Sequence, residues 1–190
     1  MNIFKIFVFV LLFFNLENSS NSVEIKNLAS INNKSITNVD LIQEIKIMEL
    51  LENIKIKKND HSFVLQKMIR DKIKAIEIEK NKISIPEKSI TNQYDFLKKN
   101  KLKEKKIPKE LEKLIMLKIE NTYKWNKLVN SIYSNKLAIN IDEIEEIMKS
   151  QKIPENKRNQ IIKIEKNKKL NTFSKTHFNK IKKKYLVKKY

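Results

Sequence analysis

The sequence predicts a mainly α-helical fold, in which several helices share one core and a small β-element is formed by an N-terminal hairpin. Three observations lead to this prediction. Apolar residues recur at helical spacing over most of the chain, alternating apolar and polar stretches occur only near its two ends, and glycine is absent. With 190 residues the chain can bury a core of ordinary size, and we expect a single helical domain over residues 23–190.

The first segment is expected to be a secretory signal peptide over residues 1–22. One lysine precedes nine apolar residues, Ile6 to Phe14, and small polar side chains follow. A membrane span needs roughly 20 apolar residues, so this run is more typical of a signal peptide. Ser20 and Ser22 suit a cleavage site that leaves a mature chain from Val23. The sequence therefore predicts export to a periplasm, and an uncleaved membrane anchor is the alternative.

The β-element is predicted directly behind this segment. Ala29 and Ile31 alternate with polar neighbours, and Ile36 continues the return strand. Asn32-Asn33 can take the positive φ that a tight hairpin needs in a chain without glycine. The final residues, YLVKKY, also alternate, so they could form a short strand that pairs with residues 28–32 and joins the two ends of the chain.

Six helices are predicted, and two of them begin with a recognisable cap. Thr37 is a good N-cap with Asp40 as its acidic capping-box partner, which places the first helix over residues 38–52. Asn140 and Glu143 form a second capping pair of the same kind. The remaining helices are expected over residues 62–80, 86–98, 108–134, 141–149 and 156–184.

Composition limits the chemistry that the chain can perform. The absence of cysteine excludes thiol nucleophiles and zinc–thiolate sites, and the absence of glycine excludes glycine-rich phosphate loops and the nucleophile elbow. His61 and His177 lie in separate segments without the spacing of metal ligands. The acidic run over residues 142–146 is explained by the dipole of the helix that it begins. We therefore expect no cofactor, no metal and no catalytic residue.

The net charge of +19 comes almost entirely from lysine, since Arg70 and Arg158 are the only arginines among 41 basic residues. Dispersed lysines without the arginine fork favour neither base nor phosphate recognition, so nucleic acid is not the expected partner. A basic binder of anionic surfaces or of nucleic acid is kept as the alternative function. The densest run, KKNKLKEKK at residues 98–106, is interpreted as a solvated connection between helices.

An ordered set of segments carries a family resemblance. It opens with Leu28-Ala29, Ile31-Asn32, Ile36-Thr37 and Asp40-Leu41, and it continues through FVLQKMIRDKIKAIEIEKNKISIPEKSI, KIENTYKWNKLVNSIY, INIDEIEEIM and KLNTFSKTHFNKIKKKYLV. In this order the segments resemble the strand, turn, long helices and C-terminal helix of the substrate-binding core of SurA-type periplasmic chaperones.

The resemblance implies a helical chaperone that holds unfolded outer-membrane proteins in the periplasm, close to the membrane. Such foldases carry one or two parvulin domains of roughly 100 residues before the last helix, whereas this chain has only the few residues around SQKIPENK there. Prolyl isomerase activity is therefore not implied, and a degenerate isomerase is a further alternative. The resemblance leaves the oligomeric state open.

A chaperone of this kind needs accessible methionine and aromatic side chains, because its clients are rich in alternating aromatic residues. Trp125 is excluded from this set, since its place in the middle of a long helix predicts burial. The predicted client-binding residues are Met48, Met68, Tyr94, Phe96, Tyr123 and Tyr133.

Overall fold

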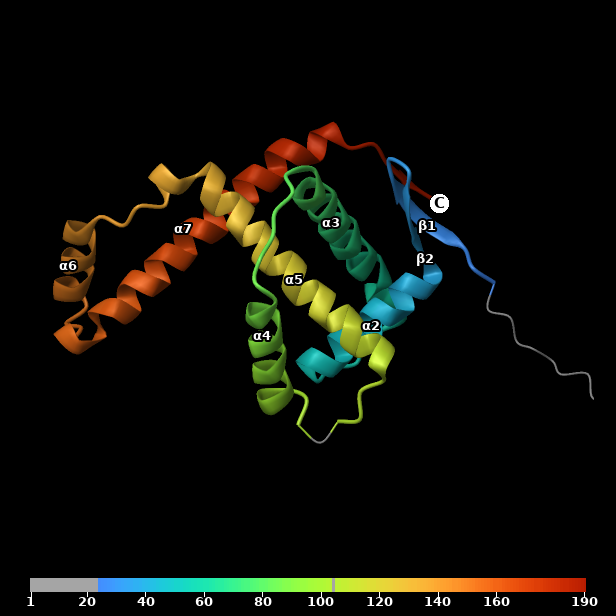
Figure 1. Cartoon of the computed structure of the whole chain (residues 1–190), viewed down its shortest axis with the longest axis horizontal. Helices are drawn as coiled ribbons and strands as arrows, with labels where there is room; N and C mark the ends of the chain where they lie inside the picture. The colour runs from blue at the N-terminus through green and yellow to red at the C-terminus, as the bar shows by residue number, and fades with distance from the viewer. Residues whose placement is uncertain (1–23, 104) are drawn as a thin grey trace, which may run out of the picture.

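The computed structural model describes residues 24–103 and 105–190, so the predicted signal peptide lies outside the described residues. Within them the chain forms a bundle of helices with a small antiparallel sheet at one end (Figure 1). The predicted class, mainly α with a small β-element, is confirmed.

The sheet joins the two ends of the described chain. It consists of β1 (Asn27–Ile31), β2 (Lys34–Thr37) and β3 (Val187–Lys189) in the order β2-β1-β3. The predicted hairpin is present, with Asn32 at a φ of 51°. The predicted C-terminal strand pairs antiparallel with β1. Asn32 also anchors the returning chain, because its N–H donates to the carbonyl of Leu186 (2.9 Å) and its Oδ1 accepts from the N–H of Leu186 (3.1 Å).

The helices begin and end within three residues of the predicted bounds. At Thr37 the capping box is complete, since the Thr37 hydroxyl accepts from the N–H of Asp40 (3.2 Å) and the Asp40 carboxylate accepts from the N–H of Thr37 (2.8 Å). The capping pair predicted at Asn140 is present only in half, because Glu143 lies 3.7 Å from Lys169 instead of returning to the cap. The helices are α2 (Asn38–Glu52), α3 (His61–Lys80), α4 (Glu87–Asn100), α5 (Lys109–Ile132), α6 (Ile141–Ser150) and α7 (Arg158–Ile181).

Two helix ends use lysine where glycine is usual. After α3, the N–H of Lys82 donates to the carbonyl of Glu79 (3.1 Å) and the N–H of Ile83 to that of Ile78 (3.4 Å). These bonds define a Schellman motif, which places Lys82 at a φ of 49°. The same motif ends α6, with Lys152 at a φ of 52°. Both lysines therefore adopt a left-handed backbone that strains a residue with a Cβ atom.

The principal core cluster lies between the sheet, α3, α5 and the end of α7. Ala29 and Ile31 of β1 are fully buried in it, and Trp125 of α5 is buried as predicted. The indole N–H of Trp125 donates to the hydroxyl of Ser174 on α7 (2.7 Å), which satisfies its polar group. This cluster fixes α3 and α5 side by side against the sheet.

A second core cluster joins α2, α4 and α5 and corrects the interpretation of residues 98–106. Leu102 is buried in this cluster, so the lysine-rich connection is anchored to the core and is not uniformly solvated. Lys105 strengthens the attachment, because its ammonium group donates to the carbonyl of Leu50 (3.0 Å) at the end of α2.

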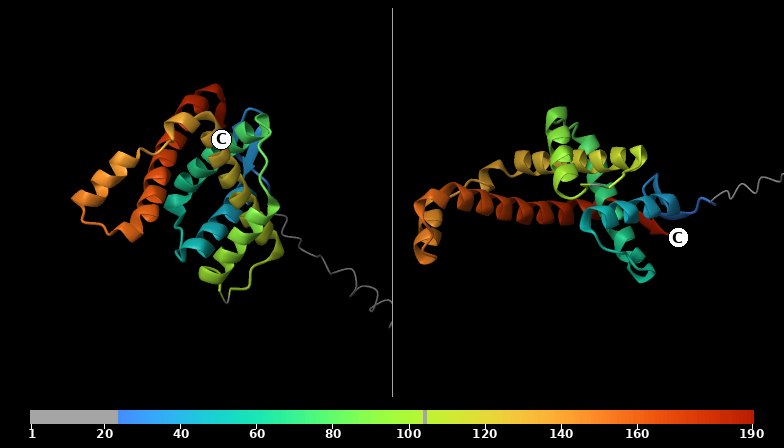
Figure 2. Two further views of the ribbon diagram at one scale, coloured as in Figure 1. Left: turned by 60° about the vertical axis from the view of Figure 1, so that its left-hand side comes forward. Right: turned by 90° about the horizontal axis from the view of Figure 1, so that it is seen from below.

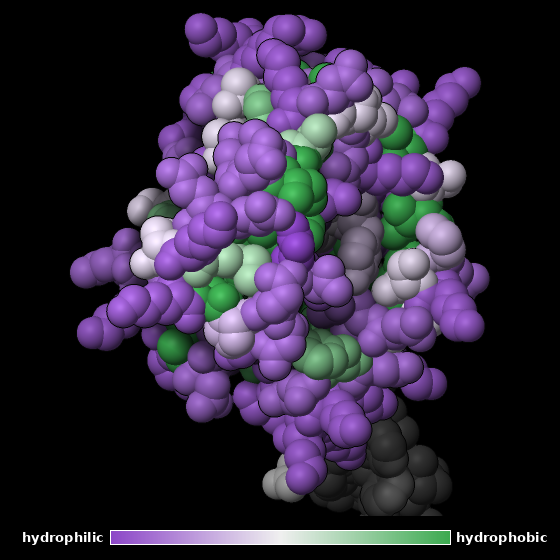
Figure 3. Space-filling model, turned by 90° about the vertical axis from the view of Figure 1, so that its left-hand side faces the viewer, coloured by the Kyte–Doolittle hydropathy of each residue, from purple (hydrophilic) through white to green (hydrophobic). Residues whose placement is uncertain are grey.

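Helix α6 and the first half of α7 form an arm that extends away from the sheet and the other helices (Figures 1 and 2). Ile144 and Met148 bury the inner face of α6 against α7. Arg158 connects the two helices through a contact with Glu145 (2.7 Å). Seen from the side of the arm, hydrophilic side chains cover most of the surface, and hydrophobic ones show in separate patches (Figure 3).

Candidate functional site

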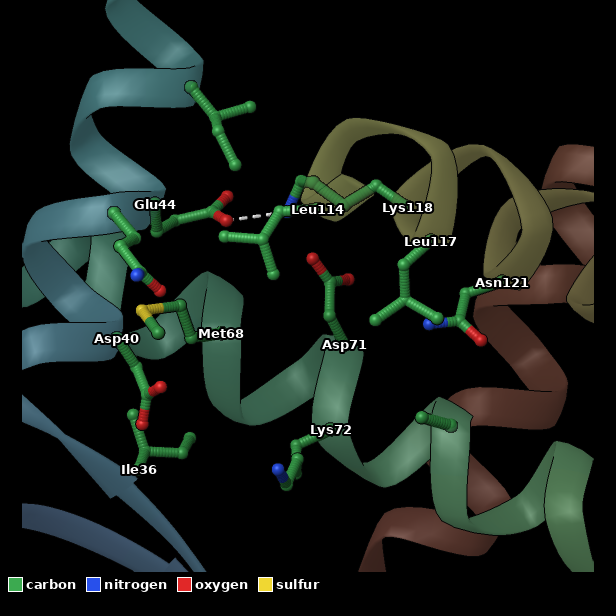
Figure 4. Close-up of a pocket in the computed structure, with 13 residues that line it drawn as sticks. Ile36, Asp40, Glu44, Met68, Asp71, Lys72, Leu114, Leu117, Lys118 and Asn121 are labelled. Atoms are coloured by element: carbon green, nitrogen blue, oxygen red, sulfur yellow. Dashed lines mark hydrogen bonds and ion pairs between the residues drawn. The ribbon is translucent and has the colours of Figure 1, made fainter. Parts of the chain in front are cut away.

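A groove of about 260 Å³ lies between α2, α3 and α5, with Ile36 of β2 at one end (Figure 4). Because half of the Leu117 side chain is exposed (50%), the groove opens to solvent. Its apolar lining consists of Ile36, Ile47, Met68, Ala75, Leu114 and Leu117. Its polar lining consists of Asp40, Gln43, Glu44, Asp71, Lys72, Lys118 and Asn121.

The three helices bring these residues together because each turns one mixed face toward the groove. On α2, Glu44 occupies the buried stripe between Leu41 and Met48, one turn from each. A carboxylate in that position needs partners from neighbouring helices. It finds them in Lys67 of α3 and Lys118 of α5.

The Glu44 carboxylate accepts from the ammonium group of Lys67 (2.8 Å) and from that of Lys118 (2.6 Å). Burial raises the pKa of the Glu44 carboxyl, but the two lysines outweigh this effect and hold its pKa below the ordinary value. Burial lowers the pKa of Lys67, yet its contacts with Glu44 and Asp71 raise it overall. Glu44 and Lys67 are therefore charged at neutral pH, and the contacts of Glu44 with Lys67 and Lys118 tie the three helices together beside the groove.

Of the six predicted client-binding residues, only Met68 lines the groove. Met68 is half-buried, and its flexible thioether points into the space between α2 and α5 (Figure 4). Leu117 completes an accessible apolar pair with it across the groove. These two side chains are the groove's adaptable apolar surface.

Two of the predicted residues are buried and unavailable to a client, which corrects the expectation for them. Met48 packs with Leu41 and Val64 between α2 and α3. Tyr94 packs into the second core cluster, where burial and the neighbouring Glu112 carboxylate raise its pKa to about 12. Both residues lie on the inward stripe of their helices, and residue type alone does not reveal that.

Of the other three predicted residues, Phe96 and Tyr123 are accessible and Tyr133 is half-buried against the principal core cluster, and all three lie apart from the groove. Phe96 is exposed on α4, and the Tyr123 hydroxyl of α5 donates to Gln93 of α4 (3.2 Å). Tyr133 stacks on Phe173 of α7, with ring centroids 5.0 Å apart. The structure therefore does not gather the six residues into one surface.

Tyr133 belongs to a joint between α5 and α7 that also holds His177. The Tyr133 hydroxyl lies 3.4 Å from Nδ1 of His177, and Nε2 of His177 has no hydrogen-bond partner among the described residues. Burial lowers the pKa of His177, so the ring is neutral at pH 7. No carboxylate is hydrogen-bonded to this ring in the described chain, and the joint is a packing contact.

Sequence reasoning missed every lining residue of the groove except Met68, including Glu44, Lys118 and Leu117. The one available signal was Glu44, an acidic residue placed within an apolar stripe. Such a residue points to a buried ion pair. The sequence alone could not identify its lysine partners among the 41 basic residues of the chain.

Over residues 24–103 and 105–190, no three His, Cys, Asp or Glu side chains are grouped closely enough to hold a metal ion. None of the helices described is both long and apolar enough to cross a membrane. Comparison with models of known protein families gives no match, and comparison with curated protein sequences gives none either.

Proposed function

We propose that the protein is a periplasmic holdase of the SurA type, which binds unfolded outer-membrane proteins and has no prolyl isomerase activity. The observation that carries the proposal is the open groove between α2, α3 and α5. Its lining combines adaptable apolar side chains, Met68 and Leu117, with charged groups at the rim. A holdase needs this combination, because apolar contacts bind many sequences while charge keeps the complex in solution.

The ion network at Glu44 supports the proposal in a second way. It fixes α2, α3 and α5 through directional contacts, so the groove is open without a client and binding does not have to separate the helices. A preformed site loses less conformational entropy on binding than one that must first open.

The resemblance to SurA-type chaperones supplies the client class. Outer-membrane strands alternate apolar and polar residues, so one edge of an extended segment offers a row of apolar side chains. A groove between helices can take one or two of these at a time while the polar edge faces solvent. Weak binding of many short segments is what a holdase requires.

The test is aggregation of an unfolded outer-membrane β-barrel protein in the presence of residues 23–190, beside an unfolded soluble protein under the same conditions. Selective suppression for the β-barrel client that survives moderate salt is expected, because apolar contacts are not screened. Suppression that is absent, or that salt abolishes for both clients, would contradict the proposal. A proline-limited refolding assay should be unaffected by the protein.

A pair of variants locates the activity. Leu117→Gln removes an apolar side chain from the groove, and Ile132→Gln removes one of nearly equal exposure (48%) from the far end of the same helix. We expect Leu117→Gln to weaken client binding about fivefold, as the loss of roughly 1 kcal/mol of apolar contact requires. Ile132→Gln should bind as the unaltered protein does, and equal effects of the two changes would place the activity outside the groove.

A further inference from the structure

A dense lysine surface lies at the opposite end of the chain from the predicted signal. Its six lysines are all exposed, and none forms an ion pair with a described carboxylate. The sequence contains no Asp or Glu after Glu165 to offset them. We call this exposed segment the C-terminal lysine surface; Lys188 and Lys189 lie on opposite faces of β3, and its lysines are Lys180, Lys182, Lys183, Lys184, Lys188 and Lys189.

This surface is held on a folded framework. Tyr185 is buried, its hydroxyl donates to Glu77 of α3, and Lys80 donates to the same hydroxyl (3.2 Å). Leu186 is fixed through both of its backbone groups to Asn32, and Val187–Lys189 pair with β1. The lysines therefore project from ordered backbone and need little further ordering when they bind.

Two large apolar side chains stand exposed among the lysines. Leu186 is 63% exposed and Tyr190 is 73% exposed, although the backbone of each is hydrogen-bonded to the sheet. The exposure of Leu186 is a property of the fold, because Tyr185 and Val187 take the inward positions on either side of it. The Tyr190 hydroxyl lies 3.3 Å from that of Ser30 on β1, while most of the side chain faces solvent. Leucine and tyrosine beside lysine are the residues that enter the boundary between lipid headgroups and acyl chains.

We propose that the C-terminal lysine surface docks the protein onto a bilayer rich in anionic phospholipids. The charge is complementary, and each lysine near such a surface strengthens binding about fivefold. Leu186 and Tyr190 add apolar contact that a purely electrostatic ligand would not use. The surface contains no arginine, the residue that contacts base edges through two hydrogen bonds, so a bilayer fits it better than a nucleic acid does.

The C-terminal residues are paired with the first strand. The N–H of Tyr190 donates to the carbonyl of Leu28 (3.1 Å), so the C-terminal residues lie beside the start of β1 (Figure 1). None of the residues of the C-terminal lysine surface lines the groove, so membrane docking and client binding can be tested separately.

The experiment is cosedimentation of residues 23–190 with vesicles. This range contains all described helices and strands and leaves out the apolar N-terminal run, and its helical circular dichroism spectrum is checked first. The vesicles consist of phosphatidylcholine alone, or of roughly two parts phosphatidylcholine to one part phosphatidylglycerol. Binding to the anionic vesicles only is expected. Equal binding to both, or to neither, would overturn the proposal.

Matched variants separate the surface from the net charge. Lys182→Gln, Lys183→Gln and Lys184→Gln together should weaken binding to anionic vesicles at least about tenfold. The control combines Lys99→Gln, Lys101→Gln and Lys103→Gln, which remove three exposed lysines from the end of α4 and the connection that follows it. The control should lose less than about threefold, because those lysines lie outside the C-terminal segment that carries Leu186 and Tyr190. Equal losses would mean that net charge alone acts.

The same binding measurement tests the apolar contribution of Leu186 and the competing ligand, double-stranded DNA. Leu186→Gln should weaken vesicle binding several-fold at unchanged charge, and an unchanged affinity would remove Leu186 from the docking surface. Double-stranded DNA is the competing ligand at the same salt concentration. Tighter binding to DNA than to anionic vesicles, with the same dependence on Lys182–Lys184, would overturn the membrane assignment.

Discussion

At the scale of single residues, Glu44 is the most consequential side chain of the groove. It is a buried carboxylate between two ammonium groups from different helices. Removing one partner of a buried ion pair costs more than the pair contributes, because the remaining charges lose their compensation. The fold therefore depends on Glu44 although its ion pairs need not be strongly stabilising in themselves.

We expect Glu44→Gln to lower the free energy of unfolding by about 2–3 kcal/mol at pH 7, measured by urea denaturation. The cost is below the full value for a buried pair because Lys67 and Lys118 are still partly in contact with water. Glu145→Gln, which breaks an exposed contact with Arg158, is the control and should cost about 0.5 kcal/mol or less.

The same variant has a predictable pH dependence. The pKa of Glu44 is lower in the folded protein than its ordinary value of 4.5, so its stabilising contribution is complete above pH 4.5 and is lost as pH falls through the folded-state pKa. The difference in unfolding free energy between the unaltered protein and Glu44→Gln should therefore shrink below pH 4.5. A difference that stays constant down to pH 3 would show that Glu44 acts through packing and not through charge.

At the scale of elements, the two helix ends that place a lysine at positive φ are the clearest departure from local preference. A non-glycine residue in the left-handed region is strained by its Cβ atom, and Lys82 and Lys152 both adopt that conformation. The motif around them is complete, so the local hydrogen bonds of each helix end hold this backbone geometry and the lysines carry the strain.

Lys82→Gly and Lys152→Gly should each raise the free energy of unfolding, by about 0.5–1 kcal/mol, because glycine removes the strain. Glu146→Gly is the control, since Glu146 is exposed in the middle of α6, where glycine should lower stability by about 1 kcal/mol. Thermal unfolding of the three variants shows whether each change raises or lowers the free energy of unfolding. Destabilisation by all three would mean that the side chains of Lys82 and Lys152 stabilise the fold.

The same elements show which parts of the fold and of the groove could be predicted from the sequence. The helices were predictable because caps and apolar spacing are local, as Thr37 with Asp40 illustrates. The groove was not, because it is assembled from segments as distant as Glu44 and Lys118. Met48 and Tyr94 were misplaced because a helical stripe shows which residues share a face but not what covers it.

At the scale of the whole molecule, the arm of α6 and the first half of α7 contrasts with the body around the sheet. The helix α3 is packed by the sheet, α2 and α5, whereas the main neighbour of α6 is α7. Elements with few tertiary neighbours open locally at lower free energy than the core does. The molecule therefore combines a firmly packed body with a less stable extension.

Hydrogen exchange should resolve this difference. We expect amides of α6 around Ile144–Met148 to exchange well before those of α3 around Ile69–Ile76, because the latter are released only by global unfolding. Measurement by mass spectrometry of peptic fragments is sufficient, with α5 as an internal reference for the core. Equal protection of α6 and α3 would contradict a less stable arm.

The pairing of β1 with β3 also determines how the protein responds to mechanical force. The two strands run antiparallel with Lys189 opposite Ala29, so residues 24 and 190 leave the sheet at the same end. Tension between these points pulls across the ladder and breaks its hydrogen bonds one after another, whereas tension along the strands would load them all together. Force applied between residues 24 and 190 should therefore detach β3 at low force and leave the helices folded.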